Sequence, residues 1–230
     1  ITKWDSLCDR KLFRIIKFIN GSSAWRQTGS IGDSPDELHL GSFSDADFAG
    51  DKATMRSTSG VFLALYGPHS FFPLGAQSKK QTAVSHSTVE AEIVAANHAL
   101  RTSGLPALEL WDKILDRSTV LQVYQDNQAT ARIMSTGRAP TLRHCKCTHC
   151  VSVAWLHERF LGDDMVLNDC VSDVMAADNF TKHVVNRDTW EQVCMLAGVI
   201  PGTTMKIYNI FPQNQPLRFR PPASPSCSPL

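Results

Sequence analysis

The spacing of apolar residues divides the chain into an early helix, three successive strands and a region where helices and strands alternate. Apolar residues between Leu12 and Ile19 recur at helical spacing and predict a helix over residues 5–20, followed by a polar linker over 21–36. Short apolar runs then predict three strands, and Pro73 places the third at a sheet edge or a bulge. These strands cover residues 38–46, 61–66 and 71–77.

The pattern changes to helix near residue 87. Ser87 or Thr88 can cap a helix that we expect to end before Gly104-Leu105-Pro106. The later helices are expected over residues 107–115, 128–135, 149–160 and 172–182, and the later strands over 120–125 and 165–171. Three strands followed by alternating helices and strands predict an α/β fold with a mixed sheet flanked by helices.

Composition narrows the class of protein. The chain has 230 residues, 43% of them hydrophobic, which is enough for a packed core. Its net charge of +1 argues against binding nucleic acid by bulk charge alone. No apolar run approaches the roughly 18 residues of a membrane span. The chain begins without Met or a signal peptide, so we expect a piece of a longer intracellular polypeptide, with seven free cysteines and a disordered proline-rich tail.

Four acidic residues fall at element ends or on helices. Asp45 and Asp126 follow predicted strands, and Glu92 and Asp178 lie on predicted helices. Neighbouring strands lie about 4.8 Å apart, so carboxylates at their ends repel each other unless a cation intervenes. A set of oxygen ligands suits Mg²⁺ or Mn²⁺, and two such ions about 4 Å apart can promote phosphodiester hydrolysis. Ordinary surface acids would give the same spacing, so this interpretation needs more support.

Six short blocks occur in a fixed order between residues 38 and 183. They are SDADFAGD at 44–51, RSTSG at 56–60, SKKQ at 78–81, STVEAE at 87–92, DNQ at 126–128 and ADNFTK at 177–182. Together they resemble the ribonuclease H domain of the Pol polyprotein of copia-type LTR retrotransposons. The resemblance implies a ribonuclease H-like mixed five-stranded sheet, with three antiparallel strands and then parallel strands, flanked by helices.

The resemblance also divides the chain. Residues 1–37 resemble the end of a reverse transcriptase and its connection, 38–183 the ribonuclease H-like domain, and 184–230 a C-terminal helix with a proline-rich tail. The implied activity is hydrolysis of the RNA strand of RNA–DNA hybrids during reverse transcription, with two Mg²⁺ ions, or Mn²⁺ as a substitute. The implied partners are the hybrid and the reverse transcriptase of the same polyprotein, with no membrane. The implied location is a cytoplasmic virus-like particle or the nucleus.

The resemblance assigns the metal ligands to Asp45, Glu92, Asp126 and Asp178. Asp47 shares a strand face with Asp45, so periodicity alone does not separate the two. On the helix, Glu90 and Glu92 are about 200° apart, and we expect Glu90 to turn towards solvent.

Basic and polar residues near the expected centre are candidates for contacts with the hybrid. Basic side chains there would bind phosphates, and hydroxyl or amide groups could recognise the RNA 2′-hydroxyl, although ordinary solvated side chains would look the same. The candidates are Arg56, Ser57, Lys79, Lys80, Asn127, Gln128 and Lys182.

Two departures from the family pattern keep other functions open. An aromatic residue expected before the SKKQ block is replaced by Leu74-Gly75-Ala76-Gln77, and no His lies between residues 162 and 177, although His183 follows. These departures would suit a decayed module that only binds hybrid or tethers the reverse transcriptase. An integrase-like nuclease acting on DNA ends is a third hypothesis, which the SKKQ block disfavours.

A run of Cys and His residues over 144–150 suggests zinc, because thiolate and imidazole groups suit that ion. The spacing departs from that of usual zinc motifs, which have a distant second pair of ligands. We therefore predict a loop with incidental thiols here.

Overall fold

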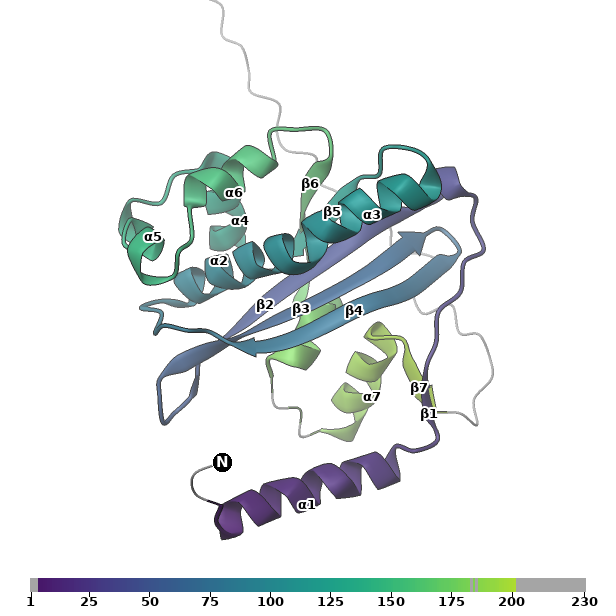
Figure 1. Ribbon diagram of the computed structural model, residues 1–230, viewed down its shortest axis with the longest axis vertical. Coiled ribbons are helices and arrows are strands. Elements are labelled where there is room, and N and C mark those ends of the chain that lie inside the picture. Colours follow the sequence, from purple (N-terminus) through teal and green to yellow (C-terminus); the bar gives the residue numbers. More distant parts are fainter. Residues whose placement is uncertain (1–3, 183, 185, 202–230) are drawn as a thin grey trace, which may run out of the picture.

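A mixed five-stranded sheet forms the centre of the molecule, in the order β4-β3-β2-β5-β6 (Figure 1). The computed structural model describes residues 4–182, 184 and 186–201. β2, β3 and β4 pair antiparallel, whereas β5 and β6 run parallel to β2. The strands are β2 (His39–Asp51), β3 (Arg56–Gly67), β4 (Ser70–Lys80), β5 (Leu121–Gln125) and β6 (Met165–Asp169). The predicted mixed sheet, with three antiparallel strands followed by parallel ones, is confirmed.

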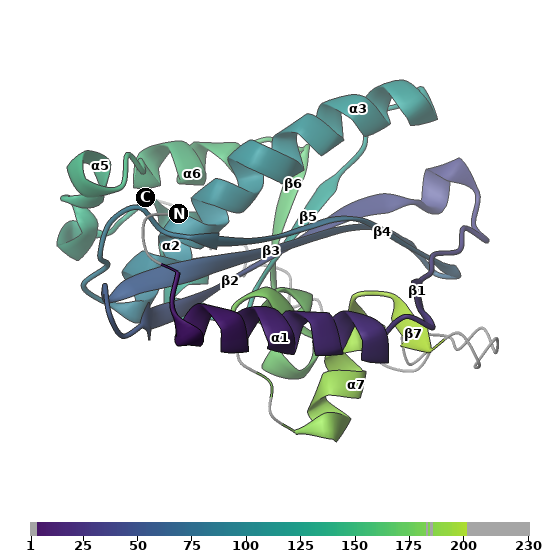
Figure 2. The same ribbon diagram turned by 60° about the horizontal axis from the view of Figure 1, so that its bottom comes forward.

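One face of this sheet is covered by five helices (Figure 2). They are α2 (Thr88–Ala99), α3 (Leu105–Leu115), α4 (Gln128–Thr136), α5 (Cys145–Thr148) and α6 (Val153–Arg159). Leu40, Ile93, Leu121 and Leu156 are fully buried between the sheet and these helices. Burial of their side chains contributes roughly 1.5–3 kcal/mol each, so this apolar layer holds α2 firmly on the sheet.

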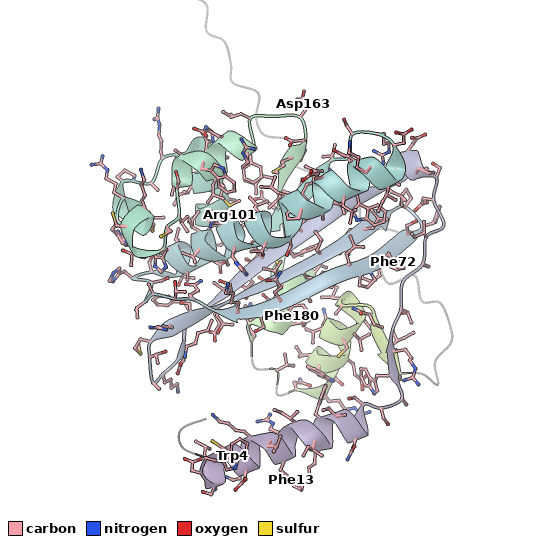
Figure 3. The ribbon with its side chains drawn as sticks, in the orientation of Figure 1. Trp4, Phe13, Phe72, Arg101, Asp163 and Phe180 are labelled. Atoms are coloured by element: carbon pink, nitrogen blue, oxygen red, sulfur yellow. The ribbon has the colours of Figure 1, made fainter. Side chains whose placement is uncertain are left out.

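Aromatic residues fill the other face. The ring of Phe43 stacks on Tyr124 with a centroid distance of 4.4 Å, and Phe62 stacks on Phe180 at 6.2 Å. Phe180, labelled in Figure 3, belongs to the 3₁₀ helix η5 (Ala176–Phe180), which lies against this face. Helix α7 (Arg187–Leu196) packs on η5. Because β3 is buried on both faces, its residues 61–66 form a continuous apolar run.

Pro73 lies on β4, which is an edge strand, as its sequence predicts. The pairing register shifts between Leu63 and Ala64, opposite Pro73 and Gly75. A proline cannot donate a ladder hydrogen bond, so an edge position with a bulge tolerates it.

The helix predicted from residue 87 does not end before Gly104, so this predicted boundary is wrong. A π-helical turn, η2 (Leu100–Gly104), connects α2 directly to α3, and the N–H of Leu105 donates to the carbonyl of Leu100. Pro106 falls in the first turn of α3, where its missing N–H costs little. A Cβ at Gly104 would lie 2.9 Å from Leu121 Cδ2, so glycine here permits close packing on the sheet.

Two further predicted helices differ from the structure. The helix predicted over 149–160 starts only at Val153, because Cys150 has a positive φ of 57° and Ser152 caps the new helix. The helix predicted over 172–182 is replaced by two 3₁₀ helices, η4 (Ser172–Val174) and η5, which the extended backbone of Met175 separates.

The segments that precede and follow the five-stranded sheet in the sequence contact each other. The predicted linker over 21–36 contains β1 (Trp25–Gln27), which pairs antiparallel with β7 (Val199–Pro201). Helix α1 (Ser6–Gly21) forms as predicted, and Phe18 packs edge-on against Trp190 of α7 at 5.6 Å. The remaining 3₁₀ helices are η1 (Pro35–Glu37) and η3 (Pro140–Leu142). The tail over 202–230 and His183 lie outside the described residues.

Within the described ranges, none of the helices combines the length and apolar character needed to cross a bilayer.

Candidate active site

Three carboxylates from distant parts of the chain meet at the end of the central strands. Asp45, Asp126 and Asp178 each offer an oxygen, and these oxygens all lie within 4.8 Å of one another. Phe43 and Tyr124 are register partners on the parallel strands β2 and β5, and Asp45 and Asp126 each follow that pair by two residues. The pleat returns to the same face every second residue, so strand register brings these two carboxylates together.

Asp178 reaches the cluster because η5 approaches the sheet closely at Gly60. Gly60 pairs with Asp45 across β2 and β3. A Cβ at Gly60 would lie 2.6 Å from the carbonyl oxygen of Ala177 and 2.7 Å from Thr181 Cγ2. Only glycine therefore allows η5 to lie this close to Asp45.

Hydroxyl groups fasten the same segment to the sheet and the carboxylates. Ser78 Oγ donates a hydrogen bond of 2.6 Å to the carbonyl oxygen of Phe180. Thr181 Oγ1 donates to Asp45 Oδ2, and Ser172 Oγ donates to Asp126 Oδ2 at 3.2 Å. These contacts fix the direction of two carboxylates before any cation binds.

Glu92 approaches the cluster from α2 and is almost completely buried. Gln125 Nε2 donates to Glu92 Oε2 at 3.3 Å, and Ser44 Oγ donates to Gln125 Oε1 at 3.4 Å. Burial, followed by the negative charge of Asp45, raises the pKa of Glu92 to about 8, and Asp126 adds to this effect. Without a neutralising charge nearby, Glu92 therefore carries a proton at neutral pH.

Asp178 is the second carboxylate whose ionisation is opposed. Burial raises its pKa to about 6, with Asp45 and Asp126 adding to the rise and Lys182 opposing it. The ammonium of Lys182 donates to Asp178 Oδ2 at 2.6 Å. Asp178 Oδ1, in contrast, is buried and has no hydrogen-bond partner among the described residues.

These features fit a hard divalent cation. A buried carboxylate oxygen without a donor costs free energy, which coordination to a cation would recover. Oxygen ligands without nitrogen or sulfur suit Mg²⁺ or Mn²⁺. The residues able to hold such ions are Asp45, Asp126 and Asp178, with Glu92 beside them.

Asp47 and Glu90, the acids closest in sequence to Asp45 and Glu92, occupy different surroundings. Asp47 is half-buried, and burial followed by the charge of Asp45 raises its pKa, but its oxygens are not part of the three-carboxylate cluster. Glu90 was expected to face solvent, and this expectation is wrong. Its side chain is fully buried and accepts hydrogen bonds from His144 and His149, because the α5 region covers this side of α2.

The candidate basic contacts lie at the surface. The exposed candidates are Arg56, Lys79, Lys80, Gln128 and Lys182. Lys80 pairs with Asp51, and Lys182 pairs with Asp178.

Two candidates for contacts with the hybrid have structural partners instead. Ser57 is fully buried, and its Oγ accepts a hydrogen bond of 3.1 Å from the N–H of Ala49. Ser57 is therefore not retained as a surface contact, because burial in the strand hides its hydroxyl. Asn127 is half-buried and caps α4, where its Oδ1 accepts from the N–H of Thr130 at 3.0 Å.

A positioning residue that the sequence did not single out is Gln81. Its Nε2 donates to Ser59 Oγ at 3.0 Å and to the carbonyl oxygen of Ala91 at 2.9 Å, while Oε1 accepts from Ser85. Gln81 thus ties the sheet to α2 next to Glu92. The signal available in the sequence was its place at the end of the SKKQ block.

The sequence matches no family model and no curated protein. Among solved structures, LC11-RNase H1, isolated from compost by a metagenomic approach, is 17% identical, with 62% of this chain and 92% of that chain covered and a TM-score of 0.43. The same enzyme in complex with an RNA/DNA hybrid is 16% identical over 62% and 93%, with a TM-score of 0.38. The NurA nuclease from Sulfolobus solfataricus is 7% identical over 82% and 64%, with a TM-score of 0.35.

Proposed function

We propose that this protein is a metal-dependent endonuclease that hydrolyses the RNA strand of RNA–DNA hybrids. The observation that carries the proposal is the convergence of Asp45, Asp126 and Asp178 within 4.8 Å, with Glu92 buried beside them. Acids without a shared function have no reason to converge in one partly buried cluster, because their mutual repulsion destabilises the fold.

Each side chain has a role in this proposal. The carboxylates of Asp45, Asp126 and Asp178 would hold two Mg²⁺ ions, which when bound supply an activated water and stabilise the leaving oxygen of a phosphodiester. Glu92 holds a proton at neutral pH until positive charge arrives, so its protonation is coupled to cation binding. Lys182 keeps an ammonium beside Asp178, where it can attract a phosphate.

The substrate class follows from the exposed groups around the cluster. Arg56 and Lys79 are exposed cations that would contact backbone phosphates, and Gln128 would offer its amide to an RNA 2′-hydroxyl. The net charge of +1 means that binding depends on these local groups, so it should weaken with added salt.

The biological setting belongs to the same proposal. The six sequence blocks support an origin in the Pol polyprotein of a copia-type retrotransposon, where the nuclease would remove the RNA template during reverse transcription. In that setting residues 1–37 join it to a reverse transcriptase, 38–183 form the nuclease, and 184–230 supply a helix and a proline-rich tail. The site of action would be a cytoplasmic particle or the nucleus.

Cleavage of an end-labelled RNA–DNA hybrid at low salt tests this function. With Mg²⁺ the protein should cleave the RNA strand of the hybrid and leave duplex DNA intact. Asp126→Asn should abolish cleavage, whereas Asp169→Asn should not, since Asp169 is an exposed carboxylate at the end of the neighbouring strand β6.

The contradicting outcome is a folded protein that leaves the hybrid intact with Mg²⁺ and with Mn²⁺. Hybrid binding without cleavage, unchanged by Asp126→Asn, would favour a decayed module that only binds.

A further inference from the structure

A second group of metal-binding side chains lies next to the carboxylate cluster, on the other side of α2. Glu90, His144 and Cys145 each offer a ligand atom, and these atoms lie within 4.8 Å of one another. Glu90 Oε1 is 3.1 Å from His144 Nε2 and 3.0 Å from His149 Nε2. Oε1 of Glu90 thus faces two imidazole nitrogens, and the thiol of Cys145 lies in the same group. His149 is not part of the 4.8 Å group and joins it through its contact with Glu90.

The group is enclosed but has an open side. Glu90 and Cys145 are fully buried, and the side chain of His149 is 1% exposed. The side chain of His144 is 40% exposed, which gives an ion a route from solvent. A metal held here would be shielded from water on all sides except at His144.

Hydrogen bonds orient the carboxylate of Glu90. The N–H of His86 donates to Oε2 at 2.9 Å, which leaves Oε1 for the two histidines. Both carboxylate oxygens of Glu90 are therefore held in fixed directions in a buried place.

We propose that Glu90, His144, Cys145 and His149 bind one structural Zn²⁺ ion. Zinc prefers four ligands at the corners of a tetrahedron, with Zn–N distances of about 2.0 Å, which separates neighbouring ligand atoms by about 3.3 Å. The two O···N distances in this group, 3.0 and 3.1 Å, already approach that value. A mixed set of nitrogen, sulfur and oxygen ligands selects zinc over magnesium.

The composition of this site explains why the Cys and His residues over 144–150 do not match a usual zinc motif. Three of its ligands are local, but the fourth is Glu90, a carboxylate more than fifty residues earlier on α2. Cys147 and Cys150 are exposed and lie outside the group.

The ion would fasten the segment around α5 to the helix that carries Glu92. The buried side chains Leu142 and Val151 anchor the same segment on either side of the ligands. Zinc binding would therefore stabilise the folded chain and the position of α2, without entering the hydrolytic site.

The test uses the full chain, freed of metal with a chelator and then titrated with Zn²⁺ against a coloured competing chelator. One equivalent should bind, and a free Zn²⁺ concentration of 100 times the Kd should raise the Tm by about 5–10 °C. Cobalt in place of zinc should give a thiolate-to-metal absorption band.

Matched variants locate the ligands. Cys145→Ser should remove the cobalt–thiolate band and weaken zinc binding at least tenfold, whereas Cys147→Ser, two residues further on, should change neither. His144→Ala, at a partly exposed position where folding is not at risk, should also weaken binding at least tenfold. Asp126→Asn should leave zinc binding intact.

The proposal is overturned if the folded protein binds no zinc, or if Cys145→Ser and His144→Ala both leave the affinity unchanged. Zinc binding that Asp126→Asn abolishes would overturn it as well, because the ion would then lie among the hydrolytic carboxylates. None of these measurements uses cleavage, so the hydrolytic function stands or fails separately.

Discussion

Two glutamates on one helix show how neighbouring side chains decide the chemistry of a carboxylate. Glu90 and Glu92 are both buried on α2, about 200° apart around the helix axis. Hydrogen-bond donors surround Glu90, and they lower its pKa in spite of burial. Other carboxylates lie near Glu92, and together with burial they raise its pKa to about 8. The same residue type is therefore ionised on one side of α2 and protonated on the other.

The difference extends to the metals that each side suits. The side of Glu92 offers only carboxylate oxygens, from Asp45, Asp126 and Asp178, which favours magnesium. The side of Glu90 adds imidazole and thiol groups, which favours zinc. Helix α2 would thus separate a hydrolytic site from a structural one.

The largest expected effect is a difference in the rate of hybrid cleavage between variants of Glu92 and Glu90. Glu92→Gln should lower the rate of hybrid cleavage by about 10- to 100-fold, because it removes the carboxylate that can ionise beside the metal ligands when cations bind. Glu90→Gln should leave the rate within about tenfold, provided that circular dichroism shows a folded chain. Equal losses in both variants would remove the functional distinction between the two sides of α2.

The pH dependence of stability should report the crowding of the carboxylates. Glu92 has a pKa of about 8 in the folded chain against 4.5 as its ordinary value. Between these pH values the folded chain binds more protons than the unfolded chain, so the free energy of unfolding falls as the pH rises.

The expected fall for the metal-free protein is roughly 2–4 kcal/mol between pH 4.5 and pH 8, measured by urea unfolding. Glu92→Gln should flatten the curve, and Mg²⁺ should offset the loss above pH 7. A metal-free protein whose stability is the same at both pH values would show that these charges do not repel as described.

A glycine substitution tests how Asp178 is held in the cluster. Gly60→Ala should destabilise the fold by about 1–3 kcal/mol and slow cleavage, because the new methyl group would push η5 away from Asp45. Gly75→Ala on the edge strand is the matched control, since nothing lies within 4 Å of its added Cβ. If the two variants unfold at the same urea concentration, the close approach at Gly60 does not matter.

The smallest expected effect concerns an exposed cation. Lys79→Ala should weaken hybrid binding slightly and reduce the slope of log K against log salt concentration by about 1, as expected for one lost phosphate contact. Fluorescence anisotropy at several salt concentrations measures both quantities. An unchanged slope would mean that Lys79 does not contact the hybrid.

The sequence predicted where the strands lie because short apolar segments mark them. The edge position of Pro73 also follows from a local pattern, whereas the pairing of three antiparallel strands with parallel ones was implied by the resemblance. The continuous helix through Gly104 and Pro106 did not follow, because a π-helical turn absorbs two residues that usually end helices.

For the site, the sequence placed two of the acids at strand ends and two on helices, but it did not give the distances between them. Asp45 and Asp126 meet because Phe43 and Tyr124 pair in register, and this pairing of β2 with β5 forms only in the folded chain. The burial of Glu90 could not be predicted from its helix alone, since the α5 region that covers it lies more than fifty residues away in sequence.

A crystal structure of the protein with Mn²⁺ bound, located by its anomalous scattering, tests the central claim most directly. The anomalous peaks should lie among the carboxylate oxygens of Asp45, Asp126 and Asp178, within coordination distance of each. Peaks elsewhere on the surface, with these three carboxylates left without an ion at saturating Mn²⁺, would contradict a divalent-metal hydrolytic site in this protein.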